Sequence, residues 1–575
     1  MAKQWFQQVL EGISTFRSAG GKGADPFAKI YEARRAEYSL FTPQMGEDAL
    51  EKLRGYIFCY DKLPSLPSDA PVPTYNFIDG QWCAARAGTI TMSSPADNRI
   101  KLAQVPDSKE EDCEAALAAA DRYWRSLKWA EENLVYRKHV IKNFSRMLNY
   151  FYEDCLKEIR TVIPKTRLES DKDFWEAKRA ADHLEGSAER VMSGTRLPTL
   201  IDGHSYWKNE YIPGGIASIV TPMNFIYGIP IIHLAGCYLT GAPFIFKGHP
   251  FGAICNTTMI RMMLAAGAHP DTVQKVEGFG GNVEKLVSDP RVAVTVLTGS
   301  DETAAHFTRI RGLRPTKFEG GGCNWSFVDE GFSDEELKRI AVRLTYSKLG
   351  FSSHKCTTLH GIAAAPATLK KVLDYVSREM DEWQVKNPTL CDATETKVVG
   401  PCMVHKAQTA QDIQDAAEKA GATVVRRGGK LTDGLGLHGE YIKPIVLGGL
   451  KPGFKVTVNW DGKGERNIDL TTTEFFMPIL AGMEVRNFDA FTQFCLFHNN
   501  HDLAVSLWSR DDRKLVRARH MLSGMLKEND GTDSALEWEE FGAGGMGTSG
   551  NMGVGDPEAT FQIYCRRQKG RHVVF

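Results

Sequence analysis

The chain has 575 residues, 42% of them hydrophobic, with 70 basic and 71 acidic side chains. This length is enough for two or more domains with separate hydrophobic cores, and the balanced charge gives no indication of a nucleic-acid partner or an anionic membrane surface. The twelve cysteines form no CxxC pair and no zinc-ligand spacing. We therefore expect reduced thiols, no metal site and a cytoplasmic protein, or one of the mitochondrial matrix if the source is eukaryotic.

The first 72 residues form an N-terminal segment that comes before the regular alternation of apolar runs and helical segments. Apolar residues between Trp5 and Phe16 recur at helical spacing and predict an amphipathic helix. Glu11 and the small number of arginines favour a helix docked on the protein over a mitochondrial presequence. The proline-rich stretch 62–73 (KLPSLPSDAPVP) predicts a linker.

Short apolar runs and helical segments alternate through the remaining chain. Buried strands followed by helices are typical of βαβ units around a parallel sheet, and two such alternations predict two α/β domains. The stretch 229–246 is the most apolar, but its histidine, prolines and glycines favour a buried helix and strand over a membrane span. Helices are expected at 134–160 and 251–266, and strands at 216–220, 243–246, 292–297, 325–328 and 359–363.

Three features between residues 247 and 300 are each weak evidence of a dinucleotide site. GFGG (278–281) lacks the third glycine of the dinucleotide fingerprint. TGS (298–300) follows a predicted strand, where a helix start would offer free N–H groups to a phosphate. Lys247 ends a predicted parallel strand, the edge at which ligands of open α/β sheets bind. A purely structural role explains each feature equally well on its own.

Seven short motifs, taken in chain order, resemble those of the aldehyde dehydrogenase superfamily over about residues 75–575. The gaps are similar too, apart from a longer stretch between Cys356 and Glu474. Residues 312–328 and the C-terminal stretch resemble the plant-type 1-pyrroline-5-carboxylate (glutamate semialdehyde) dehydrogenases. The motifs are TPMNF (221–225), FKGHP (246–250), LTGS (297–300), FEGGG (318–322), HKC (354–356), TEFFMP (473–478) and FGAGGMGTSGNMG (541–553).

The resemblance implies an α/β fold with a Rossmann-type cofactor domain, an α/β catalytic domain and a small β oligomerisation arm, assembled as a homodimer or homotetramer. The expected divisions are an N-terminal helical extension and linker (1–72), a nicotinamide cofactor-binding domain (73–318) with 204–212 in the arm, a catalytic domain (319–525), a return to the cofactor domain (526–557) and a C-terminal oligomerisation strand (558–575).

The resemblance also implies three catalytic residues. Cys356 would be the nucleophile, and we expect polar surroundings and nearby positive charge to lower the pKa of its thiol. Asn224 and the backbone N–H of Cys356 would stabilise an oxyanion, where one donor contributes about 3 kcal/mol. Glu319 would be the general base that activates water to hydrolyse a thioester. Relatives that transfer the acyl group to coenzyme A generally lack this glutamate, so we expect a free carboxylic acid as product.

The cofactor positions implied by the resemblance predict NAD or NADP, with NAD favoured. Pro250 stands where many NAD-specific relatives carry a glutamate on the adenosine ribose, so nothing obvious repels a 2′-phosphate, and His249 would tolerate one. The implied cofactor residues are Lys247 and Glu474 for the riboses, Ser300 for the pyrophosphate, and Thr221, Pro222 and Gly299.

The substrate is expected to be a small aldehyde, with glutamate semialdehyde oxidised to glutamate as one candidate. Thr357 replaces the serine with which semialdehyde dehydrogenases hold the substrate carboxylate, and their small-residue anchor loop corresponds to Ser534 and Ala535. The acidic run 537–540 would repel an anion and favours another aliphatic or aromatic aldehyde. A cysteine hydrolase or esterase, with His354 or His360 as base, is the alternative of a different class, and an inactive relative kept for binding is a third.

Overall fold

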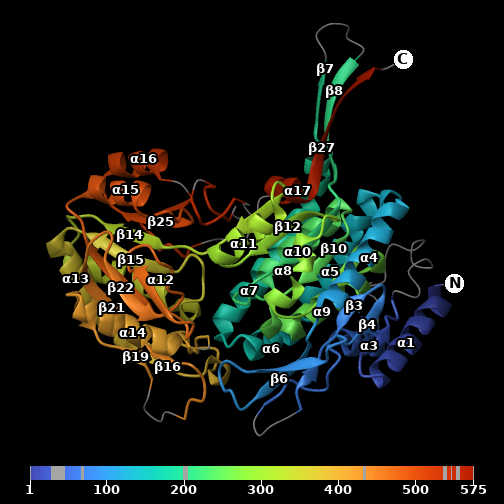
Figure 1. Cartoon of the computed structure of the whole chain (residues 1–575), viewed down its shortest axis with the longest axis horizontal. Coiled ribbons are helices and arrows are strands. Elements are labelled where there is room, and N and C mark those ends of the chain that lie inside the picture. Colours follow the sequence, from blue (N-terminus) through green and yellow to red (C-terminus); the bar gives the residue numbers. More distant parts are fainter. Residues whose placement is uncertain are drawn as a thin grey trace.

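A mixed sheet, mostly of parallel strands, forms the centre of the first half of the protein (Figure 1). The computed structural model describes residues 2–27, 46–65, 70–198, 205–403, 405–431, 436–522, 524–534, 541–545, 547–551 and 557–573. Within these residues the sheet has eight strands in the order β1-β4-β3-β11-β10-β9-β12-β13. Its parallel strands are β9 (Ile216–Val220), β10 (Phe244–Lys247), β11 (Val273–Lys275), β12 (Val292–Thr298) and β13 (Thr316–Glu319), and its antiparallel edge consists of β1 (Gly23–Ala24), β3 (Asn76–Ile78) and β4 (Gln81–Cys83).

Helices connect and cover these strands. The apolar stretch 229–246 forms the buried helix α8 (Gly228–Thr240) and then β10, as its composition predicted. No helix of the described residues is long and apolar enough to span a bilayer. The other helices of this half are α4 (Glu110–Ser126), α5 (Leu134–Tyr150), α6 (Tyr152–Val162), α7 (Arg167–Met192), α9 (Ala253–Ala266), α10 (Lys285–Ser288) and α11 (Asp301–Arg311).

The single helix predicted over 134–160 is in fact two. Phe151 ends α5 with φ −98° and ψ 27°, which is outside the helical region, and α6 begins at the next residue. Periodicity could not show this, because apolar residues continue at helical spacing through the break and pack into the same core.

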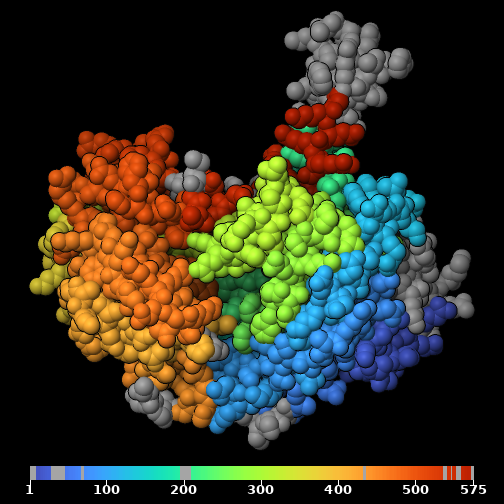
Figure 2. All heavy atoms as spheres, in the orientation of Figure 1, coloured from blue at the N-terminus to red at the C-terminus, as the bar shows by residue number. Residues whose placement is uncertain are grey.

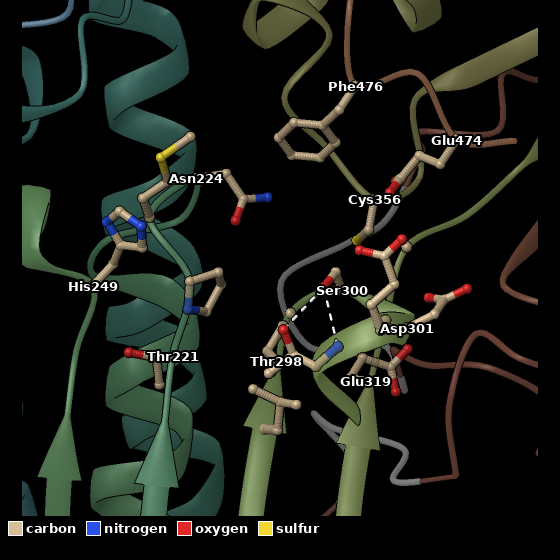
Figure 3. A pocket seen from close by; sticks show the side chains of 18 of the residues that line it. Thr221, Asn224, His249, Thr298, Ser300, Asp301, Glu319, Cys356, Glu474 and Phe476 are labelled. Atoms are coloured by element: carbon tan, nitrogen blue, oxygen red, sulfur yellow. Dashed lines mark hydrogen bonds between the residues drawn. The ribbon is translucent and has the colours of Figure 1, made fainter. Parts of the chain in front are cut away.

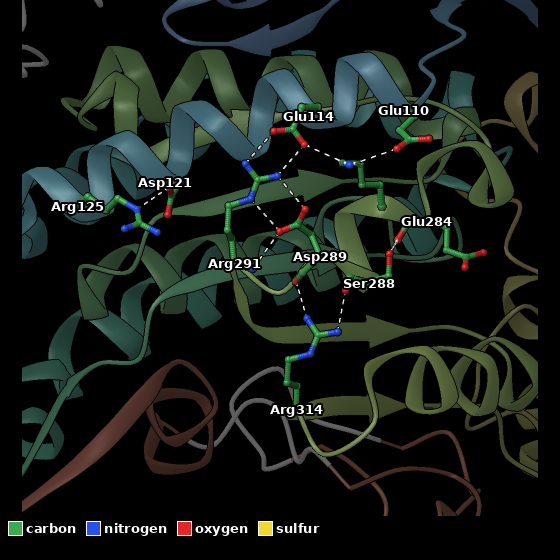
Figure 4. A network of polar contacts seen from close by, with 10 residues as sticks. Glu110, Glu114, Asp121, Arg125, Glu284, Ser288, Asp289, Arg291 and Arg314 are labelled. Carbon is green, nitrogen blue, oxygen red and sulfur yellow. Dashed lines mark hydrogen bonds and ion pairs between the residues drawn. The ribbon is translucent and has the colours of Figure 1, made fainter.

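Arginine side chains fasten the strands that lead to the site (Figure 4). Arg291, just before β12, binds Glu114 of α4 with both terminal nitrogens (2.9 and 2.7 Å) and also binds Asp289 (2.8 Å). Arg314, just before β13, donates to the carbonyl oxygens of Ser288 and Asp289 (2.7 and 2.6 Å). The amino ends of β12 and β13 are therefore held together, and their carboxyl ends emerge side by side.

A second sheet forms the centre of the other half and has seven strands in the described residues, in the order β18-β21-β24-β15-β14-β25-β26. The strands predicted at 325–328 and 359–363 are β14 and β15. The strands are β14 (Asn324–Val328), β15 (Leu359–Ala364), β18 (Thr423–Arg426), β21 (Ile445–Leu450), β24 (Ile479–Glu484), β25 (Ala504–Trp508) and β26 (Met525–Glu528), and the helices beside them are α12 (Asp334–Leu349), α13 (Pro366–Glu379), α14 (Lys406–Lys419), α15 (Phe488–Phe497) and α16 (Asp512–Met521).

The chain passes between the two halves at two places. It leaves the first sheet at Glu319 and enters the second at Asn324. The expected boundary after residue 525 falls inside β26, so the second sheet continues to Glu528, and the chain has returned to the first sheet by Gly550, which pairs with Glu319.

A three-stranded arm projects from the body beside the C-terminus (Figure 1). It joins the segment predicted near 204–212 to the C-terminal strand, which pair in antiparallel register from Cys565↔Pro213 to Val573↔Ser205. Its strands are β7 (Thr195–Pro198), β8 (Ser205–Pro213) and β27 (Cys565–Val573), preceded by α17 (Pro557–Tyr564).

The N-terminal extension packs on the first sheet, as predicted for its helix. α1 (Ala2–Ser18) buries Val9, Ile13 and Phe16, and β1 extends the sheet edge next to β4. The buried Asp25 carboxylate accepts hydrogen bonds from Tyr56 Oη (2.5 Å) and Trp82 Nε1 (2.8 Å). Other small elements are α3 (Glu47–Ile57), β2 (Val72–Pro73) with β5 (Thr89–Ser93) and β6 (Lys101–Pro106), β16 (Gln384–Val385) with β17 (Val398–Val399), β19 (Gly429–Lys430) with β20 (Ile442–Lys443), and β22 (Lys455–Asn459) with β23 (Glu465–Asp469).

Candidate active site

A cavity of about 1490 Å³ lies between the two halves, at the carboxyl ends of β9, β10, β12 and β13. Figure 2 shows the surface hollowed here, between the green and orange parts of the chain. Parallel strands direct their carboxyl ends to one edge of a sheet, where α/β proteins place ligands. Residues predicted for catalysis and for cofactor binding line this single cavity: Thr221, Pro222, Asn224, Lys247, Gly299, Ser300, Glu319, Cys356 and Glu474.

Cys356 follows a strained turn at the end of α12. Three successive non-glycine residues have positive φ, in the left-handed region that favours glycine: 55° at Phe351, 55° at Ser352 and 65° at Ser353. Such residues cost on the order of 1–3 kcal/mol each and persist only where the surroundings hold them. The turn therefore has to be fixed from outside.

Hydrogen bonds from three distant segments hold this turn and the cysteine that follows it. Glu169 of α7 accepts from Phe351 N (2.5 Å), and Ser352 Oγ accepts from Gly400 N (2.7 Å). Asn324, at the start of β14, donates to the carbonyl oxygen of Cys356 (2.7 Å). The position of the cysteine is thus set by residues distant in sequence.

Asn224 lies opposite, in the loop after β9 (Figure 3). Its Nδ2 donates to the carbonyl oxygen of His354 at 3.0 Å. An amide nitrogen carries two hydrogens, so a second remains for a ligand. The loop is fixed because the buried Asp173 carboxylate accepts from three backbone N–H groups at the start of α8 and pairs with Lys165 (2.9 Å): Ile226, Tyr227 and Gly228 are the donors.

The charge around the thiol differs from our expectation. Burial raises the pKa of the Cys356 thiol well above its ordinary value, and the carboxylates of Glu319, Glu474 and Glu176 raise it further. The predicted lowering of this pKa is therefore wrong. Burial also raises the pKa of Glu474 to about 7. A carboxylate has to accept the proton before the sulfur can act as a nucleophile.

The neighbouring cation is engaged elsewhere, which explains the difference. Lys355 Nζ lies 3.0 Å from Asp533, and Arg343 binds the same carboxylate at 2.7 Å. Although burial opposes it, Lys355 and Arg343 hold the pKa of Asp533 well below its usual range. Lys355 is adjacent to Cys356 in sequence, but its side chain pairs with Asp533 in the loop after β26.

The two histidines beside Cys356 do not form a catalytic pair with it in the described structure. The His354 ring stacks on Phe476 at 5.3 Å, and His360 Nε2 bonds to the carbonyl oxygen of Leu470 at 2.9 Å. Burial lowers the pKa of each imidazole to about 3. The arrangement that a cysteine hydrolase requires is not supported.

The cofactor half of the cavity has the features of a dinucleotide groove. Ser300 caps α11, and its Oγ accepts from Thr303 N at 3.3 Å. Because Ser300 and Asp301 line the cavity, the N-terminus of this helix faces it (Figure 3). Burial lowers the pKa of Lys247 to about 8. Thr221 Oγ1 is buried and has no hydrogen-bond partner among the described residues, and a Cβ at Gly280 or Gly281 would meet open space. These residues fit a nicotinamide dinucleotide.

Two of the residues predicted for the substrate, Thr357 and Ser534, line the same cavity. Thr357 is largely buried, and its carbonyl oxygen accepts from Thr532 Oγ1 (2.8 Å). Ser534 lines the cavity and donates from Oγ to Gly531 O at 3.1 Å. Ala535 and the acidic run 537–540 lie outside the described residues.

Sequence reasoning missed several residues that line the cavity. Lys172 and Glu176 lie within the first three turns of α7, and no motif marks them. The hairpin β22–β23 supplies four more, and the longer stretch between Cys356 and Glu474 was its only signal. The others come from α12, the start of α14 and the loops that contain His501 and Asp533. The missed residues are Lys172, Glu176, Arg343, Tyr346, Lys406, Trp460, Asp461, Lys463, Arg466, His501 and Asp533.

A family model described as "Aldehyde dehydrogenase family" matches residues 82–569. Malonate-semialdehyde dehydrogenase 2 of Oceanobacillus iheyensis is 22% identical over 509 residues, covering 86% of this chain and 96% of that protein. N-succinylglutamate 5-semialdehyde dehydrogenase of Photorhabdus laumondii is 23% identical over 494 residues, covering 83% and 91%.

Solved structures share the fold. Betaine aldehyde dehydrogenase of Staphylococcus aureus, in complex with NAD+, superposes with a TM-score of 0.77 at 19% identity, over 87% of this chain and 94% of that one. Methylmalonate-semialdehyde dehydrogenase of Oceanimonas doudoroffii gives a TM-score of 0.77 at 17% identity, over 87% and 98%.

The raised pKa of Cys356 can be measured by alkylation of the cofactor-free protein with iodoacetamide. Only the thiolate reacts, so we expect the rate at Cys356 to keep rising with pH above 9. Glu319→Gln removes one nearby negative charge and lowers the thiol pKa, which should accelerate labelling about tenfold at pH 8. Glu153→Gln, which changes a surface carboxylate paired with Arg167, should leave the rate unchanged. A wild-type rate that reaches its plateau below pH 8 would contradict this electrostatic account.

Proposed function

Since the chain belongs to the aldehyde dehydrogenase family, we propose that it oxidises an aldehyde to its carboxylic acid with NAD or NADP as hydride acceptor. The observation that carries this proposal is the convergence of Cys356, Asn224 and Glu319 on the cavity that also contains the N-terminus of α11. A nucleophile, an oxyanion donor, a base and an anion-binding helix end form the set that this reaction requires.

The first part of the proposed mechanism takes place at the sulfur. The thiol gives its proton to the carboxylate of Glu474, which leaves Glu319 ionised for the later step, and the thiolate then attacks the aldehyde carbon. Asn224 Nδ2 and the backbone N–H of Cys356 stabilise the oxyanion of the thiohemiacetal. A bound nicotinamide ring supplies the acceptor for the hydride. What remains on Cys356 is a thioester.

Glu319 completes the reaction. Its carboxylate, held by the N–H of Ala543 at 3.0 Å, removes a proton from water as the water oxygen attacks the thioester carbon. The carbon–sulfur bond then breaks, the thiolate leaves, and the carboxylic acid is released. The presence of this glutamate in the cavity supports hydrolysis over transfer of the acyl group to a second thiol.

NAD is favoured over NADP within this proposal. His249, one residue before Pro250, stacks on Phe251 at 5.6 Å, and burial, with a smaller effect from Lys247, lowers the pKa of its ring to about 3. A neutral imidazole adds no positive charge for a 2′-phosphate. Several solved structures that share this fold contain NAD.

The aldehyde that we propose carries a carboxylate, as glutamate semialdehyde does. Lys172 lines the cavity, where its ammonium donates to Tyr346 Oη (2.8 Å) and lies 5.0 Å from the centre of that ring. Neither contact neutralises its charge, whereas Asp533 compensates Lys355 and Arg343. Several curated relatives are named for semialdehydes of carboxylic acids, although none of those reported above is named for glutamate semialdehyde itself.

The arm of β7, β8 and β27 supports assembly into a homodimer or homotetramer. It projects from the body on a pair of nine-residue strands. Such a strand ribbon carries unpaired edge groups, and pairing with a second copy would satisfy them.

Cys356→Ala tests the proposed nucleophile. We expect aldehyde-dependent reduction of NAD to fall at least a thousandfold, while the dissociation constant of NADH changes less than threefold. Cys323→Ala is the matched control, because Cys323 is buried nearby and its sulfur bonds to the carbonyl oxygen of Thr471. Substantial oxidation by the Cys356 variant would refute the assignment.

Lys172→Met tests the substrate class. An ammonium–carboxylate contact in a partly buried site contributes about 1.5–3 kcal/mol, so kcat/KM for glutamate semialdehyde should fall about tenfold or more. Efficiency with propanal should change less than threefold. Lys178→Met, on the same helix and paired with Asp182, serves as control. An equal loss with both aldehydes would mean that Lys172 does not bind a substrate carboxylate. A wild-type preference above tenfold for propanal would mean that the substrate is not anionic.

A further inference from the structure

The hairpin β22–β23 occupies the longer stretch between Cys356 and Glu474. Its strands pair in antiparallel register from Lys455↔Asp469 to Asn459↔Glu465, and Val456, Val458 and Ile468 are buried in the core of the second half. At the tip, Asp461 and Gly462 have φ of 53° and 71°, and Lys463 N donates to Trp460 O (2.9 Å). Two successive left-handed residues are typical of the tight turns that suit a hairpin.

The tip is fixed to the start of α14. Lys406 pairs with Asp461 at 3.0 Å, and Asp461 N donates to Thr409 Oγ1 at 2.9 Å. The Lys406 ammonium also lies 4.9 Å from the centre of the Trp460 ring. These contacts make the tip a defined part of the cavity wall, where Trp460, Lys463 and Arg466 are exposed to the groove.

The second strand of the hairpin also contacts the opposite wall of the groove. Arg466 Nη1 lies 2.7 Å from Glu302 Oε1, in the first turn of α11. The neighbouring Asp301 lies 3.1 Å from Nε2 of His501, which also belongs to the second half. Both acidic side chains in the first turn of α11 are therefore contacted from across the groove.

These contacts matter because of what the start of α11 would bind. The N-terminus of the helix attracts an anion, but two carboxylates in its first turn oppose one. A dinucleotide pyrophosphate carries two negative charges. An arginine that pairs with Glu302 offsets this repulsion, and its remaining N–H donors, with the Lys463 ammonium, are suited to phosphate oxygens.

We propose that the β22–β23 hairpin is an additional cofactor-binding element, in which Arg466 neutralises Glu302 and, with Lys463, attracts the pyrophosphate of the dinucleotide to the N-terminus of α11. This rests on the proposed use of a nicotinamide dinucleotide. The Arg466–Glu302 pair is exposed, with 47% and 70% of the two side chains accessible. Exposed pairs contribute little to folding stability, so variants at both positions should fold.

The test is the dissociation constant of NADH, measured by its fluorescence without aldehyde. Arg466→Met should raise this constant about tenfold at 50 mM salt, and the difference from wild type should shrink in 500 mM salt. Glu302→Gln in the Arg466→Met background should return the constant to within about threefold of wild type, because the repelling carboxylate is gone. Lys455→Met, at the base of the hairpin, should have no effect.

The outcomes separate this inference from the proposed function. If wild type binds NADH and Arg466→Met binds it equally well, the role of the hairpin is refuted and the function stands. If the double variant binds as weakly as Arg466→Met, charge compensation of Glu302 is refuted. If wild type binds neither NADH nor NADPH, the proposed function itself fails.

Discussion

The glycine-rich crossing between Glu319 and Asn324 is the constraint on which the site depends. A Cβ at Gly321 would lie 2.1 Å from Glu474 Oε2, and one at Gly322 would lie 2.4 Å from the carbonyl oxygen of Cys356. Only glycine permits these approaches, since real Cβ atoms are not found so close to other atoms. The crossing therefore joins the end of the first sheet, the nucleophile turn and Glu474 in one place, and the cavity between the two halves follows from it.

The charges of the site are arranged to keep the thiol protonated at rest. The carboxylates of Glu319, Glu474 and Glu176 raise the pKa of the Cys356 thiol, while Asp533 compensates the cations Lys355 and Arg343. A thiolate would react with many electrophiles, so a thiol that loses its proton only to a positioned base is protected from side reactions. The same principle applies in the cofactor groove, where partners from the opposite wall compensate the acidic first turn of α11. In the cofactor groove these charge pairs join the two halves.

Much of the fold and part of the site could be predicted from the sequence, because those features are local. Buried strands alternate with helices, and the motifs around Asn224, Glu319 and Cys356 keep their order, so the architecture and the location of the site could be inferred. The break at Phe151, the raised pKa of Cys356 and the hairpin over 455–469 could not. Each depends on contacts between distant segments, which neither periodicity nor adjacency reports.

The central claim is that a thioester forms on Cys356 and that Glu319 hydrolyses it. The most direct measurement is rapid mixing of Glu319→Gln protein with aldehyde and NAD, with the absorbance of reduced cofactor followed from the first turnover and the intact protein then weighed by mass spectrometry. The account predicts a burst of about one reduced cofactor per active site, a slow phase at least a hundredfold below wild type, and the mass of an acyl group on Cys356. Steady turnover equal to that of wild type, with no burst and no acyl adduct, would contradict it.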